Sequence, residues 1–346
     1  MPEYLVRLEP REPWFFGGER GVEDLRREGK NRRAGVYFIR SQDTPSQTTL
    51  FGALRYLMHK SKDWEKDADV GAESYSLQAS GQTFGKIKEI SPLYLLEGED
   101  RFYVPAPMDH KKGGEKYNPY TNYLDYTTNH GDRKYPADYD GKNAFNGGWL
   151  RLDDRTIHTE LFAGVERVGV NIGKSDSGGF FKKEFKSFAK DKFCFAFFID
   201  LKEGTTKFDN QMVFLGKGRC AFRATCEECA EPKKEIHDIL GGKIAYAQSP
   251  IYADNVRALY ACCEFVCVQG PVYLRGFKTY YNEQSRNPTE GKRFDVGPEL
   301  LQLIPAGSVF LPSSPDAFAN FIKEHSEQAR ITGFNRVLYH GKDLSE

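Results

Sequence analysis

Short stretches in which apolar and polar residues alternate recur along this chain, and they predict many short β-strands. The clearest predicted strands cover residues 4–8, 36–39, 165–172, 193–201, 212–215, 259–268, 272–277 and 308–311. Helical periodicity predicts helices that follow Thr44, cover residues 252–259, and run from Pro315 to about Arg330. Because strands outnumber helices and do not alternate regularly with them, the pattern predicts an α+β fold with antiparallel sheets.

The helix after Thr44 has the most informative pattern. Thr44 suits the N-cap, Pro45 suits the first helical position, and Gln47 follows the cap by three residues, as in a capping box. The residues expected on its buried face are Leu50, Phe51, Leu54, Leu57 and Met58. Unpaired backbone N–H groups at such a helix start favour a phosphate or carboxylate, although an ordinary amphipathic helix has the same pattern.

The length of 346 residues predicts two domains, because a single hydrophobic core rarely grows beyond about 250–300 residues. No run of 18 apolar residues is present to form a transmembrane helix, and the N-terminal residues lack the pattern of a signal peptide. We therefore expect a cytoplasmic protein without a membrane partner.

The charge balance is neutral, with 49 basic and 49 acidic residues. Tight non-specific binding of nucleic acid draws on many phosphate contacts, so this balance argues against it for the isolated chain. Local excesses of positive charge remain: residues 1–60 hold 11 basic against 8 acidic residues, and residues 165–192 hold 7 against 4. These two stretches are candidate surfaces for an anionic partner, although a solvated surface often shows such excesses of charge.

The spacing of the seven cysteines argues against a metal site. The absence of familiar catalytic motifs argues against a cofactor or an active site. Cys226 and Cys229 have the spacing of metal ligands, but no second such pair follows, and the alternation around Cys263 favours buried thiols. The chain contains no GxxxxGK[ST] loop, HExxH or GxSxG motif. His59 and His158 are the candidate acid–base histidines, and a structural role fits both of them.

Two glycine-containing segments have features of phosphate-binding loops. Gly216, Lys217, Gly218 and Arg219 follow an apolar strand, so their backbone N–H groups can approach a phosphodiester while the cations neutralise it. A plain hairpin turn fits the same residues. The polar loop 173–179 includes Lys174 and is flanked by Lys182 and Lys183, which suits contact with a phosphate, and an idle loop fits the same residues.

Aromatic and arginine residues supply further candidate contacts. Trp14 and two phenylalanines precede the Gly17–Gly18 pair, and we expect one of these rings to be exposed for base stacking. Alternation in the strand 165–172 places Arg167, Gly169 and Asn171 on one face, opposite apolar residues.

The segment from Glu97 to Asp154 is long, low in aliphatic residues and rich in Tyr, Asn and Gly. We interpret it as an elaborate insertion that packs on a partner, because aromatic residues on loops favour interfaces. A surface insertion without a partner fits the composition equally well.

Five segments occur in an order that resembles a known family. They are the N-terminal strand and helix of residues 4–20 and 44–56, followed by residues 104–109, 167–181, 214–219 and 304–310. This series is similar to subunit three of the Cmr complex, a type III-B CRISPR effector, within the RAMP superfamily of RNA-binding proteins.

The resemblance implies two ferredoxin-like (RRM-like) domains, at residues 1–210 with the insertion at about 97–160, and at residues 211–346. It implies a non-catalytic subunit that holds the 5′ tag of the CRISPR RNA and docks on the large polymerase-like subunit. The backbone RAMP subunits, and target RNA through the complex, would be further partners. No cofactor or metal is implied.

The RNA-binding residues expected from the motifs and this resemblance are Trp14, Phe16, Gly17, Gly18, Arg20, Ser46, Gln47, Thr48, Arg55, Arg167, Asn171, Lys174, Gly216, Lys217, Gly218, Arg219 and Arg275. Two alternatives remain open at this stage. One is a RAMP-type, metal-independent endoribonuclease that processes CRISPR RNA, and the other is a protein scaffold that makes no RNA contact.

Overall fold

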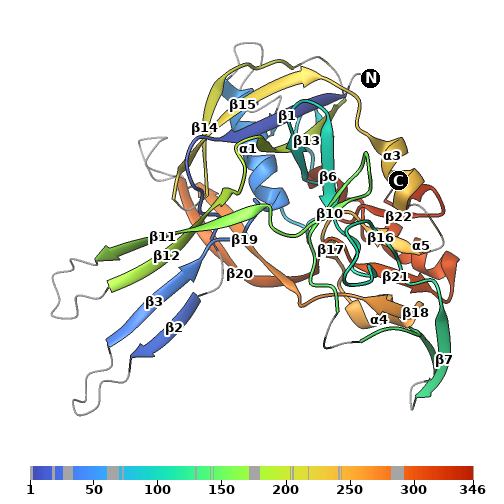
Figure 1. Cartoon of the computed structure of the whole chain (residues 1–346). Coiled ribbons are helices and arrows are strands. Elements are labelled where there is room, and N and C mark those ends of the chain that lie inside the picture. The colour runs from blue at the N-terminus through green and yellow to red at the C-terminus, as the bar shows by residue number, and fades with distance from the viewer. Residues whose placement is uncertain are drawn as a thin grey trace.

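The structure is a computed structural model. It describes residues 3–17, 20–25, 34–60, 70–71, 74–128, 131–140, 142, 144–170, 180–202, 204, 206–216, 218–240, 242, 244–281 and 292–345. A large antiparallel sheet forms the body of the protein, and smaller sheets extend from it or pack beside it (Figure 1).

The large sheet has nine strands drawn from both halves of the sequence. Its order is β10 (Ile157–His158), β9 (Trp149–Arg151), β6 (Arg101–Pro105), β5 (Tyr94–Glu97), β13 (Phe193–Leu201), β1 (Tyr4–Pro10), β15 (Cys220–Glu228) and β14 (Gln211–Leu215), with β4 (Ile87–Ile90) also paired to β13. The boundary predicted near residue 210 therefore falls inside this sheet, because β14 and β15 continue it beyond β1.

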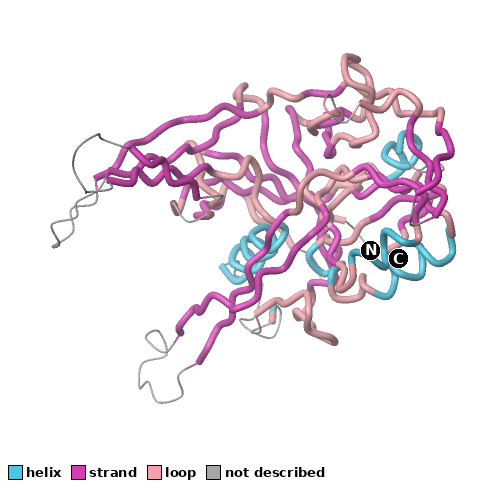
Figure 2. The backbone as a smooth tube through the Cα atoms, turned by 90° about the horizontal axis from the view of Figure 1, so that it is seen from below, coloured by secondary structure: helices cyan, strands magenta, loops and turns pink. Residues whose placement is uncertain are grey.

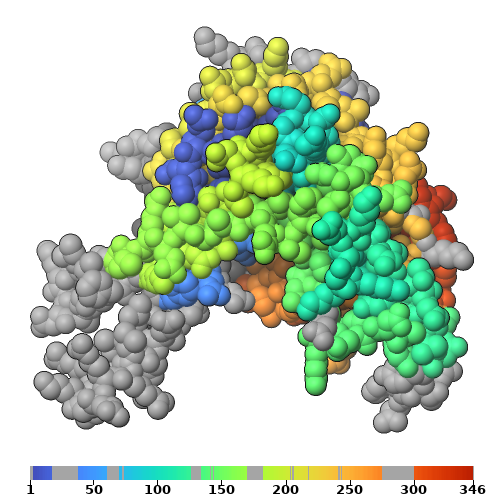
Figure 3. Space-filling model, viewed as in Figure 1, coloured from blue at the N-terminus to red at the C-terminus, as the bar shows by residue number. Residues whose placement is uncertain are grey.

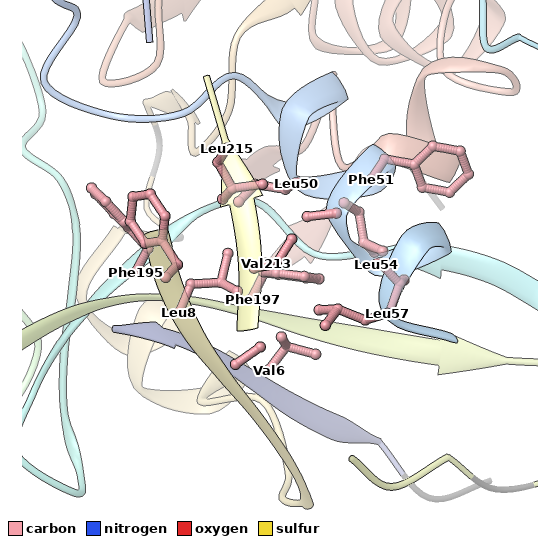
Figure 4. Close-up of a cluster of buried hydrophobic side chains, with 14 of the residues drawn as sticks. Val6, Leu8, Leu50, Phe51, Leu54, Leu57, Phe195, Phe197, Val213 and Leu215 are labelled. Atoms are coloured by element: carbon pink, nitrogen blue, oxygen red, sulfur yellow. The ribbon is translucent and has the colours of Figure 1, made fainter. Parts of the chain in front are cut away.

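Helix α1 (Gln47–Lys60) covers one face of the large sheet. Apolar side chains of the helix and of β1, β13 and β14 point toward one another in the main core (Figure 4). The five residues expected on the buried face of this helix are all buried, so the predicted periodicity is confirmed. The cap is different from the prediction: the Thr49 N–H donates to Oγ of Ser46 at 3.3 Å, and the helix starts at Gln47 rather than Pro45.

Two groups of strands project from the body as arms (Figure 2). One is a four-stranded sheet in the order β11 (Phe162–Val170), β12 (Phe180–Phe188), β3 (Ala34–Arg40) and β2 (Arg20–Leu25), in which only β12 and β3 run parallel. The other is the long hairpin of β19 (Val272–Tyr281) and β20 (Lys292–Ile304), which β17 (Ile251–Tyr252) joins at its base.

The C-terminal part has a five-stranded sheet and short helices. The sheet order is β18 (Cys263–Cys267), β21 (Val309–Pro312), β16 (Ala245–Ala247), β22 (Val337–Tyr339) and β23 (Lys342–Asp343). The helices are α3 (Lys233–Leu240), α4 (Val256–Ala261), α5 (Pro315–Glu324) and the 3-10 turn η1 (Ala329–Thr332). The strand expected over residues 259–268 starts only at Cys263, because α4 occupies the residues before it.

The segment interpreted as an insertion is partly built into the body. Its strands β6 and β9 pair within the large sheet, and Leu150 of β9 is fully buried. The remainder includes the hairpin of β7 (Tyr123–Thr128) and β8 (Gly131–Pro136), whose Lys134 pairs with Glu264 of β18 at 2.8 Å. The strands β6 and β9 of this segment therefore belong to the large sheet, and its packing on a partner stays a prediction.

The observed class is the expected one, α+β with mostly antiparallel sheets and few helices. Among the described residues, none of the helices has the length and apolar character needed to cross a membrane. Cys226 is buried in the main core whereas Cys229 is partly exposed, and the described part of the chain holds no cluster of three metal-ligating side chains.

Candidate nucleic-acid interface

The glycine hairpin between β14 and β15 packs tightly against the segment that contains Phe15. Gly216 has a φ of +73°, and a Cβ atom at this position would lie 2.2 Å from the carbonyl oxygen of Phe15. The N–H of Arg219 donates to the carbonyl of Gly216 at 3.1 Å and closes the turn. Glycine is thus required where the turn meets the Phe15 backbone. Lys217 lies outside the described residues.

Two phenylalanines in contact bring cations from the projecting sheet to this hairpin. The rings of Phe15 and Phe185 lie 5.3 Å apart, and a Cβ at Gly218 would lie within 3.6 Å of both side chains. The Arg167 guanidinium lies 4.4 Å from the Phe185 ring centroid, and the Lys183 ammonium 5.7 Å from that of Phe15. We call the surface formed by Arg167, Lys183 and Arg219 the basic face.

The register of β11 and β12 places two cations of the basic face side by side. Arg167 of β11 is directly opposite Lys183 of β12, so the two cations share one face of the projecting sheet. Arg167 and Arg219 are exposed, and neither forms an ion pair within the described part of the chain. On the other face, Val168 is 70% exposed.

The aromatic residues expected to stack on bases are part of the core instead. Trp14 is fully buried, with ring centroids 4.9 Å from Phe188 and 5.0 Å from Phe195, and its Nε1–H donates to the Asp43 carbonyl at 2.9 Å. The Phe16 ring stacks on Phe222 at 5.9 Å. Neither ring therefore has the position predicted for an RNA contact.

Two predicted contacts of α1 also have internal partners. The Gln47 side chain is buried and donates to the carbonyls of Ser91 and Gly333, both at 3.2 Å. Arg55 donates through Nε to the Val70 carbonyl at 3.0 Å and lies over the ring of Phe84. Both residues connect segments of the body, and their predicted RNA contacts stay predictions.

Ser46 and Thr48 have different surroundings from Gln47 and Arg55. Their hydroxyl oxygens lie 3.0 Å apart at the start of α1, and both residues are partly exposed. Gly17 lies beside this region, and its carbonyl accepts the Gln42 N–H at 2.8 Å. Gly18, Asn171 and Lys174 lie outside the described residues, and only the backbone of Arg20 and Arg275 is described. Their predicted contacts stay predictions.

A central cleft of about 530 Å³ lies where several of the sequence motifs meet. The start of α1, the Pro105–Ala106 segment and the Pro305–Ala306 segment line it, with Tyr273 exposed at its rim. The molecular surface is hollowed between the projecting sheet and the teal segment that follows β6 (Figure 3). Among the described residues that line the cleft, Asp43 alone is charged. The cleft therefore suits uncharged groups, such as base edges, better than phosphates.

The two histidines considered for acid–base chemistry lie on different elements. His59 is exposed in the last turn of α1. His158 of β10 is partly buried beside the Tyr103 ring at 5.4 Å, and burial lowers the pKa of its imidazole. Of the predicted RNA-binding residues that the structure describes, Arg167, Gly216, Gly218 and Arg219 lie close together, in the basic face and its glycine hairpin.

The sequence indicated Lys183 only as a residue that flanks the loop 173–179, and sequence reasoning missed two further side chains near this site, Tyr56 and Phe214. Lys183 lies two residues before the buried Phe185 and shares its face of β12, which places the cation beside that ring. Tyr56 and Phe214 are exposed aromatic residues on α1 and β14, and their exposure follows from the packing of both elements.

A comparison with solved structures finds chains of similar fold. One chain of the type III-B Cmr-beta complex, solved by cryo-EM bound to cognate target RNA, is similar in fold with a TM-score of 0.53 and 13% identity, covering 99% of this chain and 100% of that chain. A chain of the same complex with target RNA and AMPPnP has a TM-score of 0.49 and 12% identity, covering 99% and 97%. Curated protein sequences give no match.

The family model for the CRISPR-associated protein Cas_Cmr3 matches residues 6–246, which is well over half of the chain. The matched region contains the strands and the helix that form the main core, together with the basic face. This chain belongs to the Cas_Cmr3 family of CRISPR-associated proteins.

Proposed function

We propose that this chain is the RNA-binding subunit of a type III-B Cmr effector, which holds the 5′ tag of the CRISPR RNA and docks on the large polymerase-like subunit. Contacts with the backbone RAMP subunits, and with target RNA through the complex, belong to the same proposal. The proposal also includes a non-catalytic role and an arrangement of two ferredoxin-like domains. Membership of the Cas_Cmr3 family supports it, as does a similar chain from a complex bound to target RNA.

The basic face is the observation that carries the RNA-binding role. Arg167, Lys183 and Arg219 gather cations beside a glycine hairpin whose Gly216 and Gly218 are exposed. Cations and exposed backbone N–H groups are what a phosphodiester chain needs for close approach. Single-stranded RNA presents both its phosphates and its unstacked bases, so it fits a site in which cations and a cleft for uncharged groups lie on one subunit.

The test measures binding of CRISPR RNA carrying its native 5′ tag against the same RNA with a scrambled tag, at two salt concentrations. It uses the full chain alone and together with the large subunit. Arg167→Glu and Arg219→Glu should weaken binding, and each lost phosphate contact should reduce the salt slope by about 0.7. Arg257→Glu, an exposed arginine on α4, makes the same charge change away from the basic face and serves as the control.

A tag preference that needs the large subunit and weakens in both basic-face variants would support the proposal. Equal binding of both RNAs by every variant would contradict it and favour a protein scaffold. Shortened RNA in the reaction, lost on His59→Ala or His158→Ala, would instead favour a ribonuclease.

A further inference from the structure

Strand β14 is the last strand of the large sheet, and it pairs on one side with β15. Within the part of the chain that the structure describes, no strand lies on its other side. Figure 1 shows β14 at the outer border of the body. The backbone N–H and C=O groups on this side of β14 are therefore those of an open sheet edge.

The sequence of β14 gives this edge little protection against pairing. Two other edge strands contain charged residues, which are Glu166 and Arg167 in β11 and Lys342 and Asp343 in β23. The sequence of β14 is Gln-Met-Val-Phe-Leu, without a charged residue or a proline. Charges and prolines on an edge strand discourage pairing with another chain, so an edge that lacks both is suited to accept a strand.

Both faces of this edge offer apolar groups to an added strand. Val213 and Leu215 are buried in the main core, on the side of α1. On the opposite face, Met212 is 41% exposed and Phe214 is 54% exposed. The side chains of an added strand would alternate in the same way, so half of them would lie beside Met212 and Phe214 and cover their apolar surface.

The other half would lie on the side of α1, where a hollow of about 360 Å³ borders β14. The residues that line it include Gly52 and Tyr56 of α1 and Val213 and Leu215 of β14. Gly52 precedes Tyr56 by four residues on the same helix face, and a Cβ atom at Gly52 would have no neighbouring atom within 4 Å. The hollow can therefore receive side chains, and pockets for alternate side chains are what give strand addition its specificity.

The charge beside the edge favours a partner that carries a carboxylate. Among the described residues that line the hollow, none has a carboxylate, while Arg219 contributes a guanidinium. The Lys60 ammonium lies 4.5 Å from the centroid of the Tyr56 ring. A strand that alternates apolar residues and has an acidic residue at the end near Arg219 would complement these surroundings.

The short length of β14 favours a different protein over a second copy of this chain. Pairing of two β14 strands would join five residues from each chain. A stable interface takes about 20–30 residues from each side. A segment of another protein can continue beyond the added strand and extend the contact.

We propose that the free edge of β14 binds an extended segment of a protein partner as an added β-strand. The backbone of this segment pairs with β14, its apolar side chains enter the hollow beside Gly52, and its acidic residue pairs with Arg219. The inference rests on the proposed place of this chain in a protein complex, and it names the edge at which one of the other subunits docks.

The test measures amide hydrogen exchange of residues 211–215 in the full chain alone, with the large subunit, and with the backbone subunits. Exchange should slow in one of these two complexes. Phe214→Lys adds a charge on the exposed face of the edge, and Gly52→Leu fills the hollow from the helix. Each variant should remove the protection and weaken binding of that subunit by about tenfold or more, the loss expected for a central interface residue.

Val168→Lys is the matched control, since Val168 is an exposed apolar residue on the edge strand β11. Wild-type exchange in both complexes, with unchanged binding by both variants, would refute the added strand and leave the proposed place in the complex standing. If the wild type binds neither subunit, both proposals fail. Protection that grows with the concentration of the chain alone would assign the edge to a second copy, and protection by CRISPR RNA alone would assign it to RNA; either result overturns the inference.

Discussion

Asp109 is a buried carboxylate whose replacement by asparagine should stabilise the protein at neutral pH. It follows β6, is fully buried, and has the Tyr117 hydroxyl as a donor at 3.0 Å to Oδ1 and 3.3 Å to Oδ2. Burial raises the pKa of the Asp109 carboxyl to about 6, and the Tyr117 hydrogen bond opposes that rise only in part.

The size and sign of the effect follow from this pKa. The carboxyl has a pKa of 3.8 before folding and about 6 after it, so ionising Asp109 in the folded state costs about 3 kcal/mol more than in the unfolded state. Because the folded pKa is the higher one, the contribution to stability is full below the unfolded value and is lost as pH rises through about 6. Asparagine has no charge to lose and retains an acceptor for Tyr117.

Urea denaturation of the wild type and Asp109→Asn across about pH 4 to 8 measures the difference directly. The free energy of unfolding of the variant should rise relative to wild type by about 3 kcal/mol over this range, with most of the change below pH 7. Tyr117→Phe removes a hydrogen bond that lowers the Asp109 pKa, so it should move the transition to higher pH. A difference between wild type and Asp109→Asn that does not change with pH would refute the reasoning.

Three further substitutions test the packing around the site. Trp14→Ala should lower the free energy of unfolding by about 3–5 kcal/mol in urea titrations, while the folded protein keeps its RNA affinity because the ring is internal. Gly216→Ala should lower both the melting temperature and the RNA affinity, since its Cβ would meet a backbone carbonyl at 2.2 Å; Gly98→Ala, with a similar φ and open space, isolates the effect of backbone strain. Arg336→Met should cost about 3–5 kcal/mol by leaving Glu231 buried without its partner at 2.7 Å, and Glu231→Gln in the same chain should recover part of the loss in urea titrations.

Local patterns predicted the elements whose burial is periodic. The apolar face of α1 is as expected, and α5 has Ser314 at its N-cap and Pro315 at its first position. The strand over residues 193–201 also has the predicted bounds. In each case the residues that decide the structure are neighbours along the chain or one helical turn apart, so the sequence contains the signal.

Long-range contacts explain the predictions that did not hold. Gln47 has the spacing of a capping residue, but its amide instead bridges Ser91 and Gly333, which are 44 and 286 residues away. Trp14 follows Pro13 in a stretch that resembles an exposed loop, yet rings from β12 and β13 surround it. No local pattern reports such partners, because each belongs to a distant strand or turn.

The sequence predicted Arg167 and Arg219 of the basic face from local motifs, but it did not predict how the residues of this face come together. Glycines and cations at residues 216–219 were visible as a motif, whereas the requirement for Gly216 comes from the Phe15 carbonyl, some 200 residues earlier in the chain. The pairing of Arg167 with Lys183 depends on the register of β11 and β12. A substitution that disturbs the contact between Phe15 and Phe185 should therefore separate the cations from the hairpin without removing any charge.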